Sequence, residues 1–584
     1  MSRWLPPLVL ACLGAAALCV RPIFSLDLWW HLSMGRAVWT HGARTVPEPV
    51  AYAGPDTYVD PEWVFDLLAL GAWSIGGVTA VTLGVALAAG LHVALVAWLA
   101  RVAGASAGAS VALAAVVGAG TVAQFMPRPQ ILFLLLLPLA LGLALRVRTR
   151  EGGARTVALV GLHLVLAVWS QAHTSVVVAP PLVLALALLP WPEGRPLDAP
   201  TVLALLTTVC WPFAGPFGLE VVDQVLRHGA GDASRYISDM RRTHLVELGP
   251  TGPDGMLFVD LVVGGALAVA AWRRRLPLGA LVAWVLGLAL ALTAVRFRST
   301  WGVLAVPLLA AGLRGATLPA WATWAVAALL PSMAAVVAPQ LGLGVDRGMV
   351  ALDLADELAR IPDGGRVIAE YDMGGVVGWR AGPSGWRVRI DGRTPVHFDA
   401  DELFAYRKAV RDPAALELLL AQDAPRAVAM YRSRPTCVVL MASSSWGAVY
   451  TDERRVLFVK GAKPRVTMPC VLPEDPTPPS QAGVDRLEGW DRALADGRAA
   501  EVRTQLEPLV EADGHEADPR VRLRLAQACG ALGDAVCVGR EGWRSALQGQ
   551  PALDLLRTHR AGMTPAQQRR VDALLPVLQG SGSP

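Results

Sequence analysis

The chain has 584 residues, of which 54% are hydrophobic and only 17% are charged, and its mean hydropathy is +0.43. Soluble domains carry about 25% charged residues, so this composition excludes a chain that is soluble throughout. The 52 lysine and arginine residues nearly balance the 48 acidic residues, which leaves a net charge of +4. Proteins that bind nucleic acid present a clustered basic surface, so this balance argues against a nucleic-acid partner.

The charged residues are unevenly distributed along the chain. Residues 1–345 contain 37 charged side chains, whereas the remaining 239 residues contain 63. An apolar first part followed by a part of ordinary charge density predicts a membrane domain over 1–345 and soluble domains after it.

Eleven apolar runs predict transmembrane helices, because a hydrocarbon core of about 30 Å requires roughly 20 apolar residues in a helix. They lie at about 4–20, 78–99, 109–125, 130–145, 156–170, 174–189, 201–216, 256–272, 278–295, 299–313 and 317–338.

The positions of the arginines predict the orientation of these spans. Short cytoplasmic loops are enriched in lysine and arginine, and the densest clusters, Arg146 to Arg155 and Arg273 to Arg275, fall on one side. The N-terminus is then cytoplasmic, and eleven spans place the C-terminal part outside. Two long loops, about 21–77 and 217–255, also lie outside. The second is strongly charged and fits either a lid or a solvated amphipathic cover.

The first outer loop combines carboxylates with an imidazole. If 26–38 is helical, Asp27, Trp30 and His31 share one face. A charged pair at a membrane border indicates a functional site, and a carboxylate beside a neutral imidazole suits a general base. We therefore predict functional roles for Asp27 and His31. Glu62 fits a functional acid or a solvated one equally well, and the tryptophans of this loop fit interfacial anchors.

Four further residues are candidates for substrate binding. Arg296 and Arg298 end a span on the outer side, where they suit either a lipid phosphate or the lipid headgroups. Arg128 lies in a proline-rich turn and would orient a pyrophosphate or cap the turn. His173 lies in an outer hairpin, where a structural role is the alternative to ligand binding.

Several motifs resemble those of bacterial multi-pass membrane proteins related to the type C (GT-C) glycosyltransferases. The resemblance covers roughly residues 20–460. The motifs are Asp27-x-Trp29-Trp30-His31-Leu32-x-x-Gly35-Arg36, Glu62-Trp63, Arg128-Pro129-Gln130, Tyr371-Asp372-Met373-Gly374-Gly375 and Ile390-Asp391-Gly392-Arg393.

This resemblance implies a site in the first outer loop. In that superfamily an acidic residue there, often with a metal, serves the transfer of a sugar from a polyprenyl-phosphate carrier. By position, Asp27 is the candidate base or metal contact, with His31 and Glu62 as supporting groups. The loop has no Asp-x-Asp pair, and Asp60-x-Glu62 is the nearest spacing. Whether a divalent metal takes part therefore stays open, with Asp27, Asp60 or Glu62 as its ligands.

The chain after 345 predicts soluble domains. A helix at 349–359 and a longer one at 400–422 alternate with strand-like runs, so residues 346–465 predict an extracytoplasmic α/β domain. The strand-like runs are 366–369, 387–390, 427–430 and 455–459. Residues 466–483 are rich in proline and predict a linker.

Residues 484–584 predict a small α-helical domain. Helical spacing recurs at 487–494, 499–509, 521–532, 535–547 and 565–578. The run 523–534 resembles a tetratricopeptide (TPR) repeat, which implies binding of a protein partner. Cys529 and Cys537 are near enough to bridge two adjacent helices in an oxidising compartment, but we expect two buried thiols.

Two functions fit these features. The first is a glycosyltransferase of the bacterial inner membrane, which moves a sugar from a polyprenyl-phosphate donor to an unknown acceptor at the outer face. Asp27 would deprotonate the acceptor, and Arg296 and Arg298 would hold the leaving phosphate. The alternative is a non-catalytic membrane scaffold that presents the α/β and TPR-like domains to protein partners.

Overall fold

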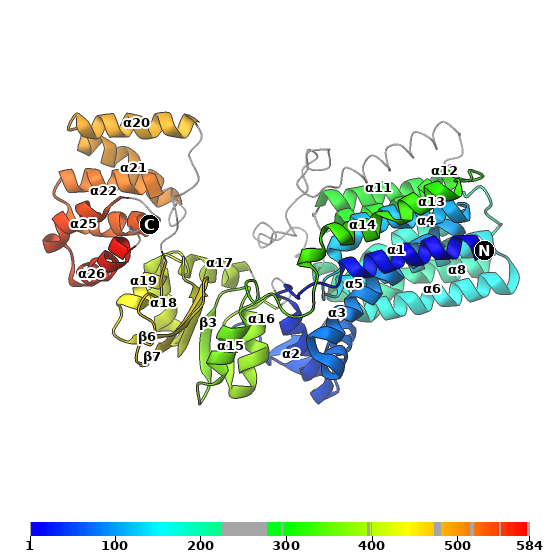
Figure 1. Ribbon diagram of the computed structural model, residues 1–584, viewed down its shortest axis with the longest axis horizontal. Coiled ribbons are helices and arrows are strands. Elements are labelled where there is room, and N and C mark those ends of the chain that lie inside the picture. Colours follow the sequence, from blue (N-terminus) through cyan, green and yellow to red (C-terminus); the bar gives the residue numbers. More distant parts are fainter. Residues whose placement is uncertain are drawn as a thin grey trace. The chain divides into compact units, whose positions relative to one another are not determined.

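The computed structural model describes residues 2–224, 277–293, 297–393, 397–398, 400–471, 481–513, 519–547 and 551–580. It consists of two compact units (Figure 1). The first unit comprises Met1–Pro49, Gly54–Val350 and Gly392–Ala400, and the second comprises Val50–Ala53, Ala351–Asp391 and Asp401–Pro584. Each unit therefore includes a short segment that is flanked in sequence by residues of the other.

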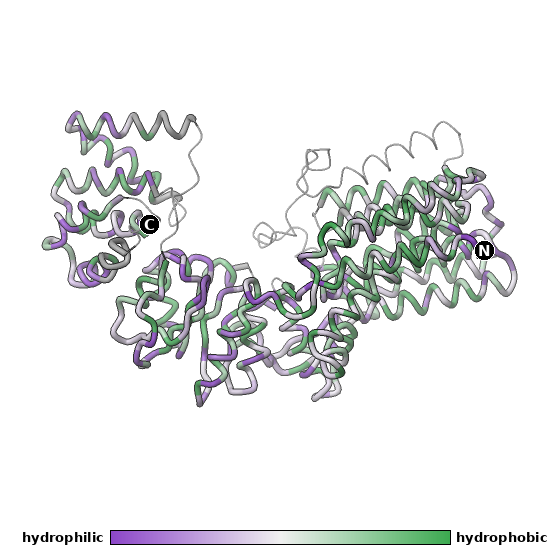
Figure 2. The backbone as a smooth tube through the Cα atoms, viewed as in Figure 1, coloured by the Kyte–Doolittle hydropathy of each residue, from purple (hydrophilic) through white to green (hydrophobic). Residues whose placement is uncertain are grey.

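The first unit is a bundle of apolar helices, which Figure 2 shows as mostly hydrophobic. Glycines allow close packing in it: a Cβ added at Gly142 would lie 2.1 Å from the Trp98 ring, and one at Gly14 would lie 2.5 Å from Pro331. The helices are α1 (Leu5–Leu18), α3 (Trp63–Val102), α4 (Ala107–Thr121), α5 (Gln130–Thr149), α6 (Gly152–Ala172), α7 (Ala179–Leu188), α8 (Ala199–Leu206), α11 (Leu278–Thr293), α12 (Arg298–Gly312), α13 (Ala320–Ala327) and α14 (Leu329–Val336).

Among the described residues, four helices are long and apolar enough to cross a membrane: Trp63–Val102, Ala107–Gln124, Gln130–Thr149 and Gly152–Ala172. A bent pair over Ala199–Ala214 and Gly218–Gln224 adds one candidate, and the other apolar helices have 10–17 residues. Every expected span overlaps one of these segments except 256–272, which lies outside the described residues. The chain is thus a membrane protein, and the number of its spans stays a prediction.

The first outer loop is folded. It contains helix α2 (Leu28–His41), as expected for 26–38, and an antiparallel hairpin of β1 (Thr45–Pro47) and β2 (Thr57–Val59). The loop ends inside α3, which breaks at Gly76 and at Gly77, where φ is +57°. This left-handed conformation favours glycine. The break separates the first turns of α3 from the part that was expected to span the membrane from residue 78.

The second unit contains a five-stranded sheet of order β4-β3-β5-β7-β6. Strand β3 is parallel to β4 and β5, whereas β7 is antiparallel to β5 and β6. The segment Val50–Ala53 adds a bridge between Ala51 and Val388 at the β4 edge. The strands are β3 (Gly365–Ala369), β4 (Trp386–Val388), β5 (Ala427–Tyr431), β6 (Trp446–Thr451) and β7 (Arg455–Lys460).

The α/β pattern expected from the sequence is present, with two differences. The sequence analysis missed strand β6. The helix expected over 400–422 is two helices, because the Asp412 side chain caps a new helix that begins at Pro413. The helices of this part are α15 (Leu352–Ala359), α16 (Gly374–Ala381), α17 (Ala400–Ala409), α18 (Pro413–Asp423) and α19 (Cys437–Ala442).

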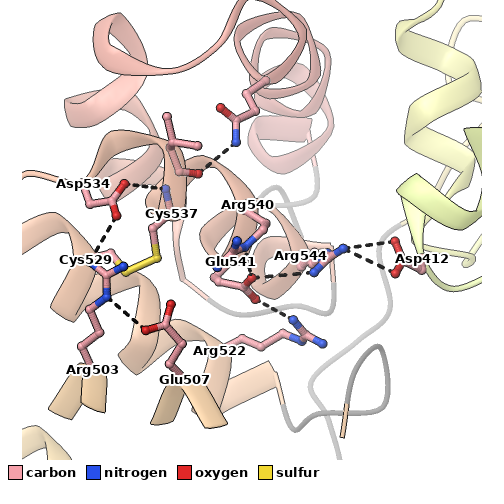
Figure 3. A network of polar contacts seen from close by, with 12 residues as sticks. Asp412, Arg503, Glu507, Arg522, Cys529, Asp534, Cys537, Arg540, Glu541 and Arg544 are labelled. Atoms are coloured by element: carbon pink, nitrogen blue, oxygen red, sulfur yellow. Dashed lines mark hydrogen bonds and ion pairs between the residues drawn. A yellow bond between two sulfur atoms is a disulfide. The ribbon is translucent and has the colours of Figure 1, made fainter. Parts of the chain in front are cut away.

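The C-terminal part is helical and contains the expected helices together with α25, which was not expected. Disulfides join Cys437 to Cys470 and Cys529 to Cys537, so the bridged alternative holds for the second pair (Figure 3). The helices are α20 (Gln481–Ala495), α21 (Ala499–Asp513), α22 (Pro519–Ala531), α23 (Ala535–Cys537), the π-helical turn η12 (Val538–Gly542), α24 (Trp543–Ala546), α25 (Leu553–His559) and α26 (Pro565–Gly580).

An internal ion pair helps to hold these helices together. Arg522 of α22 and Glu541 of η12 are both buried and lie 2.6 Å apart, and Arg544 reaches Asp412 at 3.2 Å (Figure 3). Whether this helical part is TPR-like stays a prediction.

Candidate functional site

The predicted base Asp27 is paired with the predicted phosphate ligand Arg128. Asp27 directly precedes α2, and Arg128 lies in the proline-rich turn before α5. The Nε of Arg128 lies 2.8 Å from Oδ2 of Asp27, and the two side chains are 23% and 28% exposed. The ion pair thus fixes the orientation of the carboxylate and leaves it partly open to solvent.

His31 does not face solvent with Asp27. Its Nδ1 lies 2.6 Å from Oδ1 of Asp66 in α3, and both side chains are buried. Burial is the main cause that lowers the pKa of His31 well below its ordinary value, and the positive charges of Arg128 and Arg393 add to it. The imidazole is therefore neutral, and it connects the first turn of α2 to the start of α3.

A second buried carboxyl group, that of Asp60, lies near the His31–Asp66 pair. The side chains of Asp60 and Asp66 are fully buried, and among the described residues Oδ2 of each has no hydrogen-bond partner. Oδ1 of Asp60 also accepts a hydrogen bond from the backbone N–H of Glu62 at 2.9 Å. Burial raises the pKa of Asp60 to about 6. Asp66 is not among the residues predicted from the sequence, although an acid in the first turn of an apolar helix is a signal for it.

Glu62 and His173 are also brought together. The Nε2 of His173, just after α6, lies 3.4 Å from Oε1 of Glu62. The Nδ1 of His173 accepts a hydrogen bond from the backbone N–H of Ser175 at 2.9 Å, so Nε2 is the nitrogen that donates to Glu62. Two residues chosen separately from the sequence thus form one contact between the first outer loop and the end of α6.

A segment far along the chain completes this region. Arg393 is fully buried and donates two hydrogen bonds to Glu48, at 2.7 and 2.8 Å. The Nε2 of His397 lies 3.0 Å from Oε2 of Glu48, and the Arg393 guanidinium stacks on Tyr58. Burial alone would raise the pKa of Glu48, but Arg393 and His397 hold it well below its ordinary value.

Gly392 places its backbone against the candidate base. A Cβ added there would lie 2.8 Å from Oδ1 of Asp27 and 2.9 Å from Nε1 of Trp30. Glycine is therefore required for this close approach. Arg128 and Gly392 together bound the Asp27 carboxylate. Gly392 and Arg393 belong to a motif found in the sequence but are not among the predicted site residues, because their partners lie far away in the chain.

The structure does not describe the side chains of the two predicted phosphate ligands, Arg296 and Arg298. Arg298 is the first residue of α12, and Arg296 lies outside the described residues. The second outer loop is described only as far as Gln224.

The three proposed metal ligands do not form a cluster. Asp27 is paired with Arg128 and Glu62 with His173, whereas Asp60 is buried and accepts a hydrogen bond from the backbone N–H of Glu62. Among the described residues, the one group with three ligand atoms close together is Cys529, Asp534 and Cys537, whose cysteines form a disulfide. These residues do not fit a metal site, and we derive no step through a metal.

No family model matches the chain, and no curated protein sequence matches it. Solved structures do match. The archaeal oligosaccharyltransferase AglB from Archaeoglobus fulgidus, in complex with an inhibitory peptide and a dolichol-phosphate, has a TM-score of 0.52 at 14% identity, covering 75% of this chain and 70% of that chain. The apo form of the Archaeoglobus fulgidus oligosaccharyltransferase has a TM-score of 0.52 at 11% identity, covering 79% and 75%.

ArnT from Cupriavidus metallidurans, bound to undecaprenyl phosphate, has a TM-score of 0.49 at 15% identity, covering 78% of this chain and 97% of that chain. The likeness to the oligosaccharyltransferases shows that this chain shares their fold, in line with the fold expected from the sequence. The chain is a helix-rich membrane protein with a sheet domain.

Proposed function

We propose that this protein is a membrane glycosyltransferase that moves a sugar from a polyprenyl-phosphate donor to an acceptor at the outer face of the membrane. The observation that carries the proposal is the Asp27 carboxylate, which is partly exposed, paired with Arg128 and bounded by Gly392. A fixed carboxylate that solvent reaches, in a chain with the GT-C fold, has the properties of a general base.

The reaction is a displacement at the anomeric carbon of the donor sugar. Asp27 accepts the proton of the acceptor nucleophile, whose lone pair forms the new bond to that carbon. The bond between the carbon and the phosphate oxygen breaks, and polyprenyl phosphate leaves with the electron pair. Arg128 orients Asp27, and Arg296 and Arg298 are proposed to stabilise the charge on the leaving phosphate.

His31 and Glu62 take different roles in this proposal. His31 is buried with Asp66, so we assign it as a positioning residue that fixes the start of α2 and therefore Asp27. Glu62 and His173 keep some exposure, so they are proposed to contact the acceptor or the donor sugar. Asp27 is paired with Arg128, whereas Glu62 is paired with His173. This difference in partners supports different roles for the two carboxylates.

The finer features of topology belong to the same proposal. We infer eleven spans with a cytoplasmic N-terminus, in the inner membrane of a bacterium. The domains at 346–465 and 484–584, joined by the linker at 466–483, would lie outside the cytoplasm. Two disulfides in the second unit support this location, because disulfides persist in oxidising compartments. The TPR-like helices would bind a protein partner.

The test uses membranes that carry the wild type, Asp27→Asn or Asp56→Asn, supplied with labelled polyprenyl-phosphate sugars. Asp56 is an exposed acid of the same loop and serves as the matched control. We expect Asp27→Asn to lower donor consumption by about 100-fold or more and Asp56→Asn to behave as wild type. Equal consumption by Asp27→Asn would remove Asp27 from the mechanism. Failure of the wild type to consume any donor would favour the alternative function, a non-catalytic membrane scaffold.

A further inference from the structure

A groove of about 700 Å³ opens at the C-terminal end of α2, and its lining includes Trp39, Arg44, Trp63 and Leu67. Asp27 lies at the other end of this 14-residue helix. At 1.5 Å per residue the two ends are about 20 Å apart. The groove is therefore about one helix length away from Asp27, whereas its lining residue Trp63 directly follows Glu62 in the chain. Its chemistry has to be derived from its own residues.

The groove combines indole rings with a single cation. Trp39 is 76% exposed, which is unusual for a side chain of this size. Arg44 donates a hydrogen bond from Nη1 to Oε1 of Gln171 at 2.9 Å, and Trp63 donates from Nε1 to the same oxygen at 3.3 Å. In the part of the chain that the structure describes, Arg44 forms no ion pair. One guanidinium in an otherwise apolar groove matches a ligand with one negative charge.

An apolar track leads to this groove along α6. Val157, Val160, Leu164 and Val168 are each at least half exposed. Their spacing of three and four residues places them on one face of the helix, and three residues further along is Gln171, which contacts both Arg44 and Trp63. The helix is a candidate membrane span with only 28% of its apolar window buried in the protein. This face is thus suited to contact hydrocarbon.

From Val157 to Val168 the helix rises about 17 Å, so the track covers most of the predicted span 156–170. Indole rings favour the border between hydrocarbon and headgroups, which is where Trp39 and Trp63 would then lie. A ligand that fits both parts has a hydrocarbon chain and an anionic headgroup.

We propose that this groove binds a membrane phospholipid whose headgroup carries one net negative charge. The phosphate contacts Arg44 between the rings of Trp39 and Trp63, and one acyl chain lies along the exposed face of α6. This proposal does not depend on the transfer reaction, so its outcome and that of the proposed function are separate.

The experiment compares lipids bound to the purified full chain by native mass spectrometry. Phosphatidylglycerol and phosphatidylcholine with identical acyl chains are added at equal concentration. Both lipids have the phosphate that Arg44 would bind, but phosphatidylcholine also carries a quaternary ammonium, whose positive charge is repelled by the guanidinium. We therefore expect about tenfold preference for phosphatidylglycerol. Arg44→Gln abolishes the preference, and Trp39→Phe lowers retention of phosphatidylglycerol. The matched controls are Arg195→Gln and Trp321→Phe, which change an exposed arginine and a tryptophan that is 74% exposed. In these two variants the lipid preference and the retention of phosphatidylglycerol should equal those of the wild type.

Three competitors identify the occupant. Phosphatidylglycerol with six-carbon chains binds more weakly than the long-chain lipid if the α6 track holds the tail. If glycerol phosphate competes at the same concentration as the lipid, the groove binds the anion alone and the lipid tail does not contribute. This result would overturn the proposal. Displacement by undecaprenyl phosphate at much lower concentration would assign the groove to a polyprenyl carrier instead. Equal binding of phosphatidylglycerol and phosphatidylcholine, or wild-type preference in Arg44→Gln, would also overturn it.

Discussion

Arg393 binds Glu48 through two hydrogen bonds of 2.7 and 2.8 Å, although 345 residues separate them in the sequence. Both side chains are buried within the first unit. This pair fastens the segment Gly392–Ala400 to the first outer loop. Since Gly392 lies against Asp27, the pair also determines what surrounds the candidate base.

Removal of the arginine leaves a buried carboxylate without its main partner. We expect Arg393→Ala to lower the free energy of unfolding by about 3–5 kcal/mol, measured by thermal or denaturant unfolding in detergent. Arg360→Ala, which removes an exposed arginine that pairs with Glu357, should cost no more than about 0.5 kcal/mol. A double variant with Glu48→Gln should lose less than the sum of the two single losses. Strict additivity would show that the pair is not coupled.

The close approach of Gly392 to Asp27 predicts a selective effect on turnover. In Gly392→Ala the new Cβ displaces the Asp27 carboxylate or the Trp30 ring, so kcat should fall about tenfold or more while KM for the donor changes little. Gly71→Ala is the control, because a Cβ there meets no atom within 4 Å. If Gly392→Ala and Gly71→Ala have equal kcat, the position of Asp27 does not depend on Gly392.

The raised pKa of Asp60 predicts a pH dependence of stability. In the unfolded chain Asp60 titrates near 3.8, and in the folded protein near 6. Its protonated form therefore favours folding, and this contribution is complete below about pH 4 and is lost as the pH rises through 6. Two pKa units correspond to about 3 kcal/mol.

The variant Asp60→Asn has no proton to lose at this position. Its free energy of unfolding relative to wild type should therefore rise between pH 4 and pH 7, measured by unfolding at several pH values. The groups that act on Asp60 are Asp66, Arg393 and the backbone N–H of Glu62, and all are retained in this variant. Asp56→Asn serves as the exposed control. A constant difference between Asp60→Asn and wild type across this range would refute the shift.

The two disulfides predict a count of reactive thiols. Of the seven cysteines, Cys12, Cys19 and Cys210 are free. Alkylation of the denatured, non-reduced protein from native membranes should modify three cysteines, and alkylation after reduction should modify seven, as read by mass spectrometry. Modification of all seven without reduction would place the second unit in a reducing compartment.

The sequence was informative about the first outer loop because its polar residues stand out against an apolar background. Asp27, His31, Glu62, Arg128 and His173 were all selected, and each has a buried or partly buried polar contact. Their pairing was not predictable. Arg128 follows Asp27 by about a hundred residues, and only the packing of α5 against the bundle brings the two together.

Glu48 and Arg393 show the other limit. Glu48 lies between two prolines and has the appearance of a solvated loop acid, and Arg393 lies in a glycine-containing turn of a different segment. Nothing local to either residue indicates burial.

In the second unit, periodicity predicted four strands but missed β6, whose run from Trp446 to Thr451 has mixed residue types and an irregular register with β7.

The segment Gly392–Ala400 also sets the order in which the first unit is assembled during synthesis. At about 5–20 residues per second, roughly 20–70 seconds pass between the synthesis of Glu48 and that of Arg393. Through this interval Glu48 cannot form its native pair with Arg393. The outer loop thus acquires its final form only after the ribosome has made the whole apolar bundle and the first two strands of the sheet.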